Sequence, residues 1–256
     1  MSSNHKASMI TGYGDLPFGE FSQLTEGDVG ILGVPTEMNH GPRFGTSLAP
    51  DALRKVTHQL DLTLPVKGCD LGNLSLAGDW SATLAQMLPG ILIKGTMPVV
   101  LGGATDVALA VLKALPNAPV VAALPQVRSE LTARAAPTTW LGLNGEQAID
   151  IWCQLDQCGM EYRTARQLDE GSSPHLVGPE QAVLWIDMSV IDLGHAAGVI
   201  GLNPGGMKPQ TLVSVVERLA CRWQSLVVTG MAPNLDTRGM TELVAIETIN
   251  AALHDG

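Results

Sequence analysis

The sequence predicts a three-layer α/β domain, with a mostly parallel sheet covered by helices on both faces. Short apolar runs rich in β-branched residues recur along the chain, and each is bounded by Gly or Pro. Such continuous runs are typical of strands that are covered on both faces. Segments with a helical spacing of apolar residues lie between them, so strands and helices alternate almost throughout. This alternation requires crossover connections, which produce a parallel sheet.

Six strands are predicted from the apolar runs. They read DVGILGVP, MPVVLGG, APVVAALP, TTWLGLN, AVLWIDMSVID and SLVVTGMAP, at residues 28–35, 97–103, 118–125, 138–144, 182–192 and 225–233. Val, Ile, Leu and Trp dominate these runs, which suits a buried strand. Each run is too short to be one of the longer amphipathic helices.

Six helices are predicted between and after the strands. Apolar residues recur at helical spacing at residues 50–60, 80–94, 104–115, 145–159, 208–223 and 240–256. Residues 1–27 show no clear period and are predicted to be an irregular N-terminal arm. No linker, low-complexity tract or repeat divides the rest, so residues 28–256 are predicted to form a single domain.

The composition excludes several classes of function. The 256-residue chain carries 15 basic and 25 acidic side chains, a formal net charge of −10, without a cluster of Lys or Arg that would suit nucleic acid or an anionic membrane surface. No apolar run reaches the roughly 18 residues of a membrane span, and no signal peptide is evident, so a cytoplasmic protein is expected. The four cysteines show no CxxC spacing and predict no zinc ribbon or disulfide framework. The charged fraction of 16% is below the usual value of about 25%, which favours an oligomer.

Ligands of parallel sheets bind beyond the carboxyl ends of the strands, so the segments there are the candidate functional positions. Five segments match, in order, the signatures of one family. They read GTSLAPDALR from Gly45, VVLGGATD from Val99, TTWLGLNG from Thr138, LWIDMSVIDLGHAAGVIGLNPGG from Leu184 and VVTGMAPNLDTRGMTELVA from Val227. On these motifs nearly the whole chain from Asp28 onward resembles the ureohydrolase family of arginase, agmatinase and guanidinobutyrase. The resemblance implies the arginase-like α/β fold.

The resemblance also implies where an active site would lie. Members hydrolyse a guanidinium carbon with a hydroxide held between two divalent ions, usually manganese and sometimes nickel. The six side chains that bind these ions in the family correspond here to Thr105, Leu124, Gln126, Arg128, Asp187 and Ser189. Of the six family ligands, only Asp187 is retained. The Glu that orients the guanidinium in the family is replaced by Gly230.

These replacements oppose metal binding on physical grounds. Leu124 has no electron pair to donate, and Arg128 would bring a fixed positive charge to the place of a divalent cation. The histidines do not supply another set, because no HxH or HxxxH pairing occurs among His5, His40, His58, His175, His195 and His254. The sequence therefore predicts no catalytic residue and no metal site in this chain.

Other patterns at these loops are weaker signals. GGATD lacks the GxGxxG and GxxxxGK patterns, which favours a tight strand-to-helix turn over a phosphate cradle. Asp187 and Asp192 are a candidate acid–base pair, but capping of turns is favoured. Arg128 would either pair with Asp187, its guanidinium replacing the ions, or turn toward solvent or another subunit.

The family includes heteromeric hydrolases of guanidine-type compounds, among them the biguanide metformin, in which an active subunit works beside a degenerate one. The resemblance implies that this chain is the non-catalytic subunit, in a hetero-oligomer built on trimers (a hexamer), with Ni or Mn bound only by the catalytic paralogue. His40 and His195 are expected at an interface or at the substrate entrance. Two alternatives stay open: a stand-alone binding or regulatory protein that uses the emptied pocket for a small cationic or polar ligand, and an active hydrolase with a different ligand set.

Overall fold

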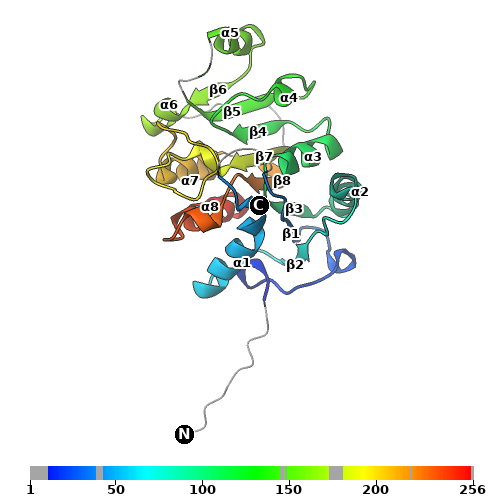
Figure 1. Ribbon diagram of the computed structural model, residues 1–256. Helices are drawn as coiled ribbons and strands as arrows, with labels where there is room; N and C mark the ends of the chain where they lie inside the picture. The colour runs from blue at the N-terminus through cyan, green and yellow to red at the C-terminus, as the bar shows by residue number, and fades with distance from the viewer. Residues whose placement is uncertain are drawn as a thin grey trace, which may run out of the picture.

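The computed structural model describes residues 11–38, 43–144, 147, 149–172, 181–219 and 221–254. In this part of the chain the strands form one eight-stranded sheet in the order β2-β1-β3-β8-β7-β4-β5-β6. Every neighbouring pair of strands is parallel. Helices cover both faces of the sheet (Figure 1), so the predicted three-layer α/β fold is confirmed.

Each of the six apolar runs overlaps a strand, and the structure adds one strand at each edge of the sheet. They are β1 Val29–Val34, β2 Gly68–Asn73, β3 Met97–Gly102, β4 Val120–Ala123, β5 Thr138–Leu143, β6 Tyr162–Thr164, β7 Gln181–Asp187 and β8 Arg222–Thr229. The two strands without a prediction, β2 and β6, are the edge strands. The predicted strand at 182–192 ends early, because a 3-10 turn, Met188–Val190, follows Asp187.

The described helices are α1 Ala49–Gln59, α2 Trp80–Ile93, α3 Asp106–Ala114, α4 Ser129–Thr132, α5 Ile149–Gln157, α6 Ala165–Asp169, α7 Pro209–Arg218 and α8 Met240–Leu253. The helix predicted at 208–223 stops at Arg218, because the following residues enter β8. The short helices α4 and α6 lie outside the predictions. Among the described residues, no helix combines the length and apolarity that a membrane crossing requires.

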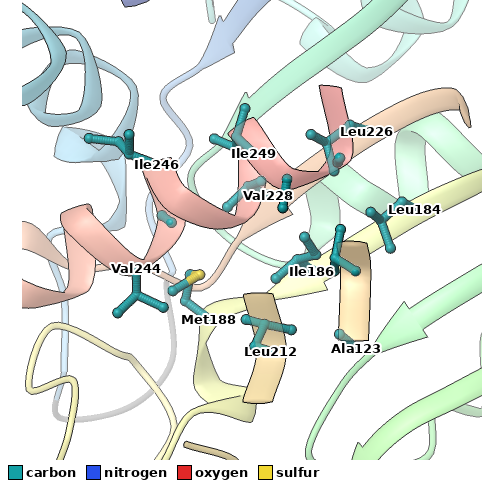
Figure 2. Close-up of a cluster of buried hydrophobic side chains, with 14 of the residues drawn as sticks. Ala123, Leu184, Ile186, Met188, Leu212, Leu226, Val228, Val244, Ile246 and Ile249 are labelled. Atoms are coloured by element: carbon teal, nitrogen blue, oxygen red, sulfur yellow. The ribbon is translucent and has the colours of Figure 1, made fainter. Parts of the chain in front are cut away.

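Two apolar layers hold the sheet between the helices. Helices α1, α6, α7 and α8 pack on one face, and α2, α3, α4 and α5 contribute to the core on the other. Figure 2 shows part of the first layer, where side chains of α8 and α7 lie close to those of the central strands. Those labelled are Ala123, Leu184, Ile186, Met188, Leu212, Leu226, Val228, Val244, Ile246 and Ile249. Burial of these groups is the main favourable contribution to folding.

The described N-terminal segment, residues 11–28, packs onto α1 and β2. It contains two 3-10 turns, Tyr13–Asp15 and Phe21–Gln23, and no α-helix. The Tyr13 side chain is fully buried, and the Tyr13 amide donates a hydrogen bond of 2.8 Å to Asp70 at the edge of the sheet. This segment therefore covers the end of the core next to α1.

Candidate functional site

A cavity of about 240 Å³ lies at the carboxyl ends of the central strands and is lined by residues at or after the ends of β1, β3, β4 and β7. The structure brings all six predicted positions to the wall of this cavity: Thr105, Leu124, Gln126, Arg128, Asp187 and Ser189. Thr105 follows β3, Asp187 ends β7, and Leu124 follows β4 directly. Parallel strands end at one edge of the sheet, so residues far apart in sequence meet here.

The turn from β3 into α3 is tight and is fixed by the segment after β1. The Gly103 amide donates to the Val34 carbonyl oxygen at 2.9 Å, and the Ala104 amide donates to Thr36 Oγ1 at 3.0 Å. A Cβ at Gly103 would lie only 1.9 Å from the Thr36 carbonyl oxygen. The glycine is thus explained by close backbone approach, as the tight-turn interpretation of GGATD requires.

The Asp187 carboxylate is held by hydroxyl and amide donors. Its Oδ2 accepts hydrogen bonds from Thr105 Oγ1 at 3.0 Å and Thr229 Oγ1 at 3.3 Å. Its Oδ1 accepts from the Ser189 amide at 3.0 Å. The residue is 3% exposed. The one carboxylate among the six positions is therefore already occupied by protein donors.

Thr229 joins this arrangement to the strand core. It is the register partner of Asp187 in the β7–β8 pair, and its Oγ1 accepts a hydrogen bond of 3.0 Å from Trp185 Nε1. The hydroxyl thus accepts from the indole and donates to the carboxylate. The sequence analysis missed Thr229, although its place at the end of a central strand, beside Gly230, is a signal for it.

Gly230 lies directly under the Asp187 carboxylate. Its φ is +78°, and a Cβ built on it would lie 2.1 Å from Asp187 Oδ1. The position that corresponds to the family's substrate-orienting Glu thus has neither the backbone conformation nor the space for a side chain. The carboxylate of Asp187 fills that space.

Arg128 does not form the pair with Asp187 that the sequence suggested as one option. Both residues are described, and no ion pair joins them. The Arg128 side chain is half-buried, lines the cavity, and has no hydrogen-bond or ion-pair partner among the described residues. The physical reason is that Asp187 faces Thr105 and Thr229, whose hydroxyls replace the guanidinium as its donors.

A network of amide side chains ties the surrounding loops together. Asn203 Nδ2 donates to the Ser189 carbonyl oxygen at 3.0 Å, and Asn144 donates to Asn203. Gln147 Nε2 donates to Asn144 Oδ1 at 3.2 Å and to the Pro125 carbonyl oxygen at 3.0 Å. Sequence reasoning missed this network, because isolated Asn and Gln residues in loops carry no distinctive spacing. The network joins the loops after β4, β5 and β7 that surround the cavity.

The loop after β1 is organised by Glu37. Its carboxylate accepts hydrogen bonds from the Gly45 amide at 3.0 Å and from Ser47 Oγ at 2.8 Å. Burial raises the pKa of Glu37, but these bonds and those from the amides of Thr46 and Ser47 outweigh it and lower the pKa to about 2. Ser47 is therefore a donor to an acid that the sequence analysis missed.

The remaining residues singled out in the sequence analysis are Asp192, His195 and His40. Asp192 accepts from the amides of Gly194 and Gly205, both at 2.7 Å, which fits turn capping. The His195 side chain is 50% exposed, with Nδ1 3.9 Å from Asp192 Oδ1, and it is not among the residues that line the cavity. His40 lies outside the described residues.

The donor set of the cavity does not fit a pair of divalent cations. Two such ions repel one another and need several carboxylates and imidazoles around them. The six positions offer one carboxylate, two hydroxyls, an amide, an alkyl group and a guanidinium. Among the residues that the structure describes, no group of three His, Cys, Asp or Glu side chains is placed to hold a metal ion.

The comparisons with known proteins agree on the family. The model of the arginase family matches residues 27–124 and 139–254. Formimidoylglutamase of Halalkalibacterium halodurans is 23% identical over 269 residues, which cover 86% of this chain and 84% of that protein. The structure is similar to proclavaminate amidino hydrolase from Streptomyces clavuligerus, with a TM-score of 0.76, 17% identity and 97% of each chain covered. It is also similar to formimidoylglutamase from Bacillus subtilis subsp. subtilis str. 168, with a TM-score of 0.74, 17% identity, and 99% of this chain and 94% of the other covered. Since the family model matches well over half of its residues, the chain belongs to the arginase family.

Proposed function

We propose that this chain is a non-catalytic subunit of a hetero-oligomeric arginase-family hydrolase. In this proposal a paralogous subunit with an intact metal site hydrolyses a guanidine-type compound, such as the biguanide metformin, and the present chain stabilises that subunit or shapes its substrate entrance. The supporting observation is the cavity lined by residues at or after the ends of β1, β3, β4 and β7. Its one carboxylate, Asp187, is bonded to protein donors, and Arg128 stands where a metal ligand would be expected.

Electrostatic repulsion by Arg128 opposes metal binding in this cavity. A guanidinium and a divalent cation about 4 Å apart, at an effective dielectric constant of about 20, repel by roughly 8 kcal/mol. Leu124, which is 1% exposed, offers no compensating ligand. Rotation of Asp187 toward an ion would break three hydrogen bonds. In the proposal, Ni or Mn is therefore bound by the partner subunit and not by this chain.

Surface composition supports a partner. Charged residues are 16% of the chain, and large apolar side chains are exposed in the segments after β1 and β7 and at the start of α8. These are Phe44 at 59%, Leu48 at 51%, Leu202 at 63% and Met240 at 44%. Apolar side chains in such positions are candidates for burial in an interface. The proposed assembly is a cytoplasmic hexamer built on trimers of the two chains.

The test is purification of the chain from its own host at native expression, followed by mass spectrometry and metal analysis. We expect a co-purifying arginase-family protein with all six metal ligands, in a fixed ratio, and with metal in proportion to that partner alone. The partner should hydrolyse guanidines or biguanides less well when it is prepared without this chain. Recovery of this chain alone, as a homo-oligomer, contradicts the proposal.

A second candidate is an active hydrolase. It is favoured by the relative named formimidoylglutamase, which matches 86% of this chain. The experiment is to incubate the purified lone chain with Mn or Ni and to assay formimidoylglutamate hydrolysis with and without a chelator. Chelator-sensitive turnover by the lone chain supports this candidate. Turnover only in the presence of the co-purifying partner supports the first proposal.

A further inference from the structure

We propose that the cavity at the ends of β4 and β7 binds a small carboxylate through Arg128. Arg128 is the residue directly before α4, and it lines a cavity of about 240 Å³. It is half-buried, and no described residue donates to it, accepts from it or pairs with it. Arginine presents five N–H donors in a planar fork. Among the described residues, this partly desolvated guanidinium is therefore a hydrogen-bonding group without a protein partner, and it is available to a ligand.

The sign of the free charge determines the class of ligand. Asp187, the acid of the same cavity, is 3% exposed and accepts three hydrogen bonds from the protein. Its charge is thus compensated from within the fold, whereas that of Arg128 is not. A cavity that would hold cations in an intact family member here presents a cation of its own, and it selects an anion.

The planar shape of the Arg128 guanidinium and the other walls of the cavity indicate which class of anion fits. A carboxylate matches the planar guanidinium with two parallel hydrogen bonds. The walls of the cavity include the apolar residues Met38, Leu124 and Ile200. At about 30 Å³ per water molecule, the cavity has room for roughly eight waters, so a ligand of about six to eight heavy atoms fits. A carboxylate on a short apolar chain satisfies both the fork and these walls.

This inference does not rest on the proposed function, because a lone chain presents the same cavity. The same chemistry, a carboxylate on a short apolar chain, comes either from a free acid or from a Glu side chain of a neighbouring subunit. Butyrate mimics both. If butyrate still binds when the co-purifying partner is present, the natural ligand is a free acid. If the partner displaces butyrate, the natural ligand is a Glu side chain of the partner.

The experiment is ligand-observed NMR on the lone chain with three probes that share one carbon skeleton: butyrate, n-butylammonium and 1-butanol. We expect saturation transfer to butyrate and an affinity at least about tenfold lower in Arg128→Gln, because a charge-assisted hydrogen bond contributes at least that factor. Arg128→Lys keeps the charge without the fork and should bind with intermediate affinity.

Arg222→Gln is the matched control, because Arg222 lines a different and larger cavity, of about 490 Å³, together with Glu26 and Trp223. This variant should bind butyrate as the wild type does. Circular dichroism and melting temperature confirm that Arg128→Gln is folded, which is expected for a side chain without protein partners. Equal binding of butyrate by Arg128→Gln and wild type, or stronger binding of n-butylammonium than of butyrate, overturns the proposal.

Discussion

The Asp187 carboxylate occupies the space that a side chain on Gly230 would need. A Cβ at position 230 would lie 2.1 Å from Asp187 Oδ1 and 2.7 Å from its Cγ. The family resemblance assigns a metal ligand to the first position and a substrate-orienting Glu to the second. The packing of the Asp187 carboxylate is therefore sterically incompatible with a side chain at position 230. The acid has become part of the structural hydrogen bonding at the end of the sheet.

The first prediction concerns Gly230→Ala. The substitution adds strain at φ +78° and displaces a carboxylate that accepts three hydrogen bonds. The control is Gly72→Ala, because Gly72 has φ +73° and nothing within 4 Å of its Cβ position. We expect Gly230→Ala to lower the free energy of unfolding by about 1–3 kcal/mol more than Gly72→Ala does, measured by urea denaturation.

A double-mutant cycle separates contact from strain. In an Asp187→Ala background the carboxylate is absent, so Gly230→Ala should lose no more stability than Gly72→Ala. If instead Gly230→Ala costs the same with and without Asp187, the two residues are not coupled.

The second prediction concerns the buried ion pair between Arg54 and Asp70. Arg54 Nε and Nη2 donate to the two Asp70 oxygens at 2.7 Å and 2.9 Å, and Asp70 is fully buried. Arg54→Leu leaves an uncompensated buried carboxylate and should cost about 3–5 kcal/mol in the free energy of unfolding. Arg54→Lys should recover only part of this loss, because it cannot reproduce the two parallel bonds.

The control for Arg54 is Arg166→Leu. Arg166 pairs with Glu170 at 2.8 Å, but the two side chains are 86% and 61% exposed. This substitution should leave the free energy of unfolding nearly unchanged, because exposed ion pairs contribute little to stability. Similar losses for the two variants would show that burial does not set the strength of the Arg54–Asp70 pair.

The third prediction concerns Glu37 and acid stability. Its pKa is lowered to about 2 in the folded chain, so its contribution is present above the pKa of the unfolded chain and is lost as pH falls toward 2. Glu37→Gln should cost about 1–2 kcal/mol at pH 7, discounted for partial exposure, and the gap to wild type should narrow by pH 3.5. Urea midpoints at both pH values test this. Glu217→Gln, at an exposed position on α7, should show no such gap.

The sequence was sufficient for the centre of the sheet and insufficient for its edges. Six continuous apolar runs predicted β1, β3, β4, β5, β7 and β8. β2 reads GCDLGN and β6 has only three residues, Tyr162–Thr164. Edge strands are covered on fewer sides, so they need neither length nor a continuous apolar run, and no period identified them.

The positions of the site were predictable, whereas its hydrogen bonds were not. Motif order alone placed Thr105, Asp187 and Gly230 at one edge of the sheet, and the structure places them there. The direction of the Asp187 side chain depends on Thr229 and on the open space above Gly230. Both follow from packing between β7 and β8, which a one-dimensional pattern does not specify.

The last prediction concerns Glu242, a carboxyl group on α8 that the family resemblance does not use. It is 5% exposed, and its Oε2 has no hydrogen-bond partner among the described residues. Burial, and to a lesser degree the negative charge of Asp236, raises the pKa of Glu242. A raised pKa means that the folded chain holds this proton more tightly than the unfolded chain does. Stability is then complete below the unfolded pKa and declines as pH rises through the folded pKa.

Glu242→Gln keeps the shape and removes the ionisation, so its melting temperature should lack that decline. Relative to wild type, the variant should gain stability as pH rises from the unfolded pKa of the Glu242 carboxyl through its raised folded pKa, whatever the difference in stability at low pH. Glu247→Gln, at an exposed position on the same helix, should follow the wild-type curve throughout. Parallel curves for Glu242→Gln and wild type would mean that Glu242 ionises in the folded chain at no cost, because a water molecule or a partner surface then supplies the donor that Oε2 lacks.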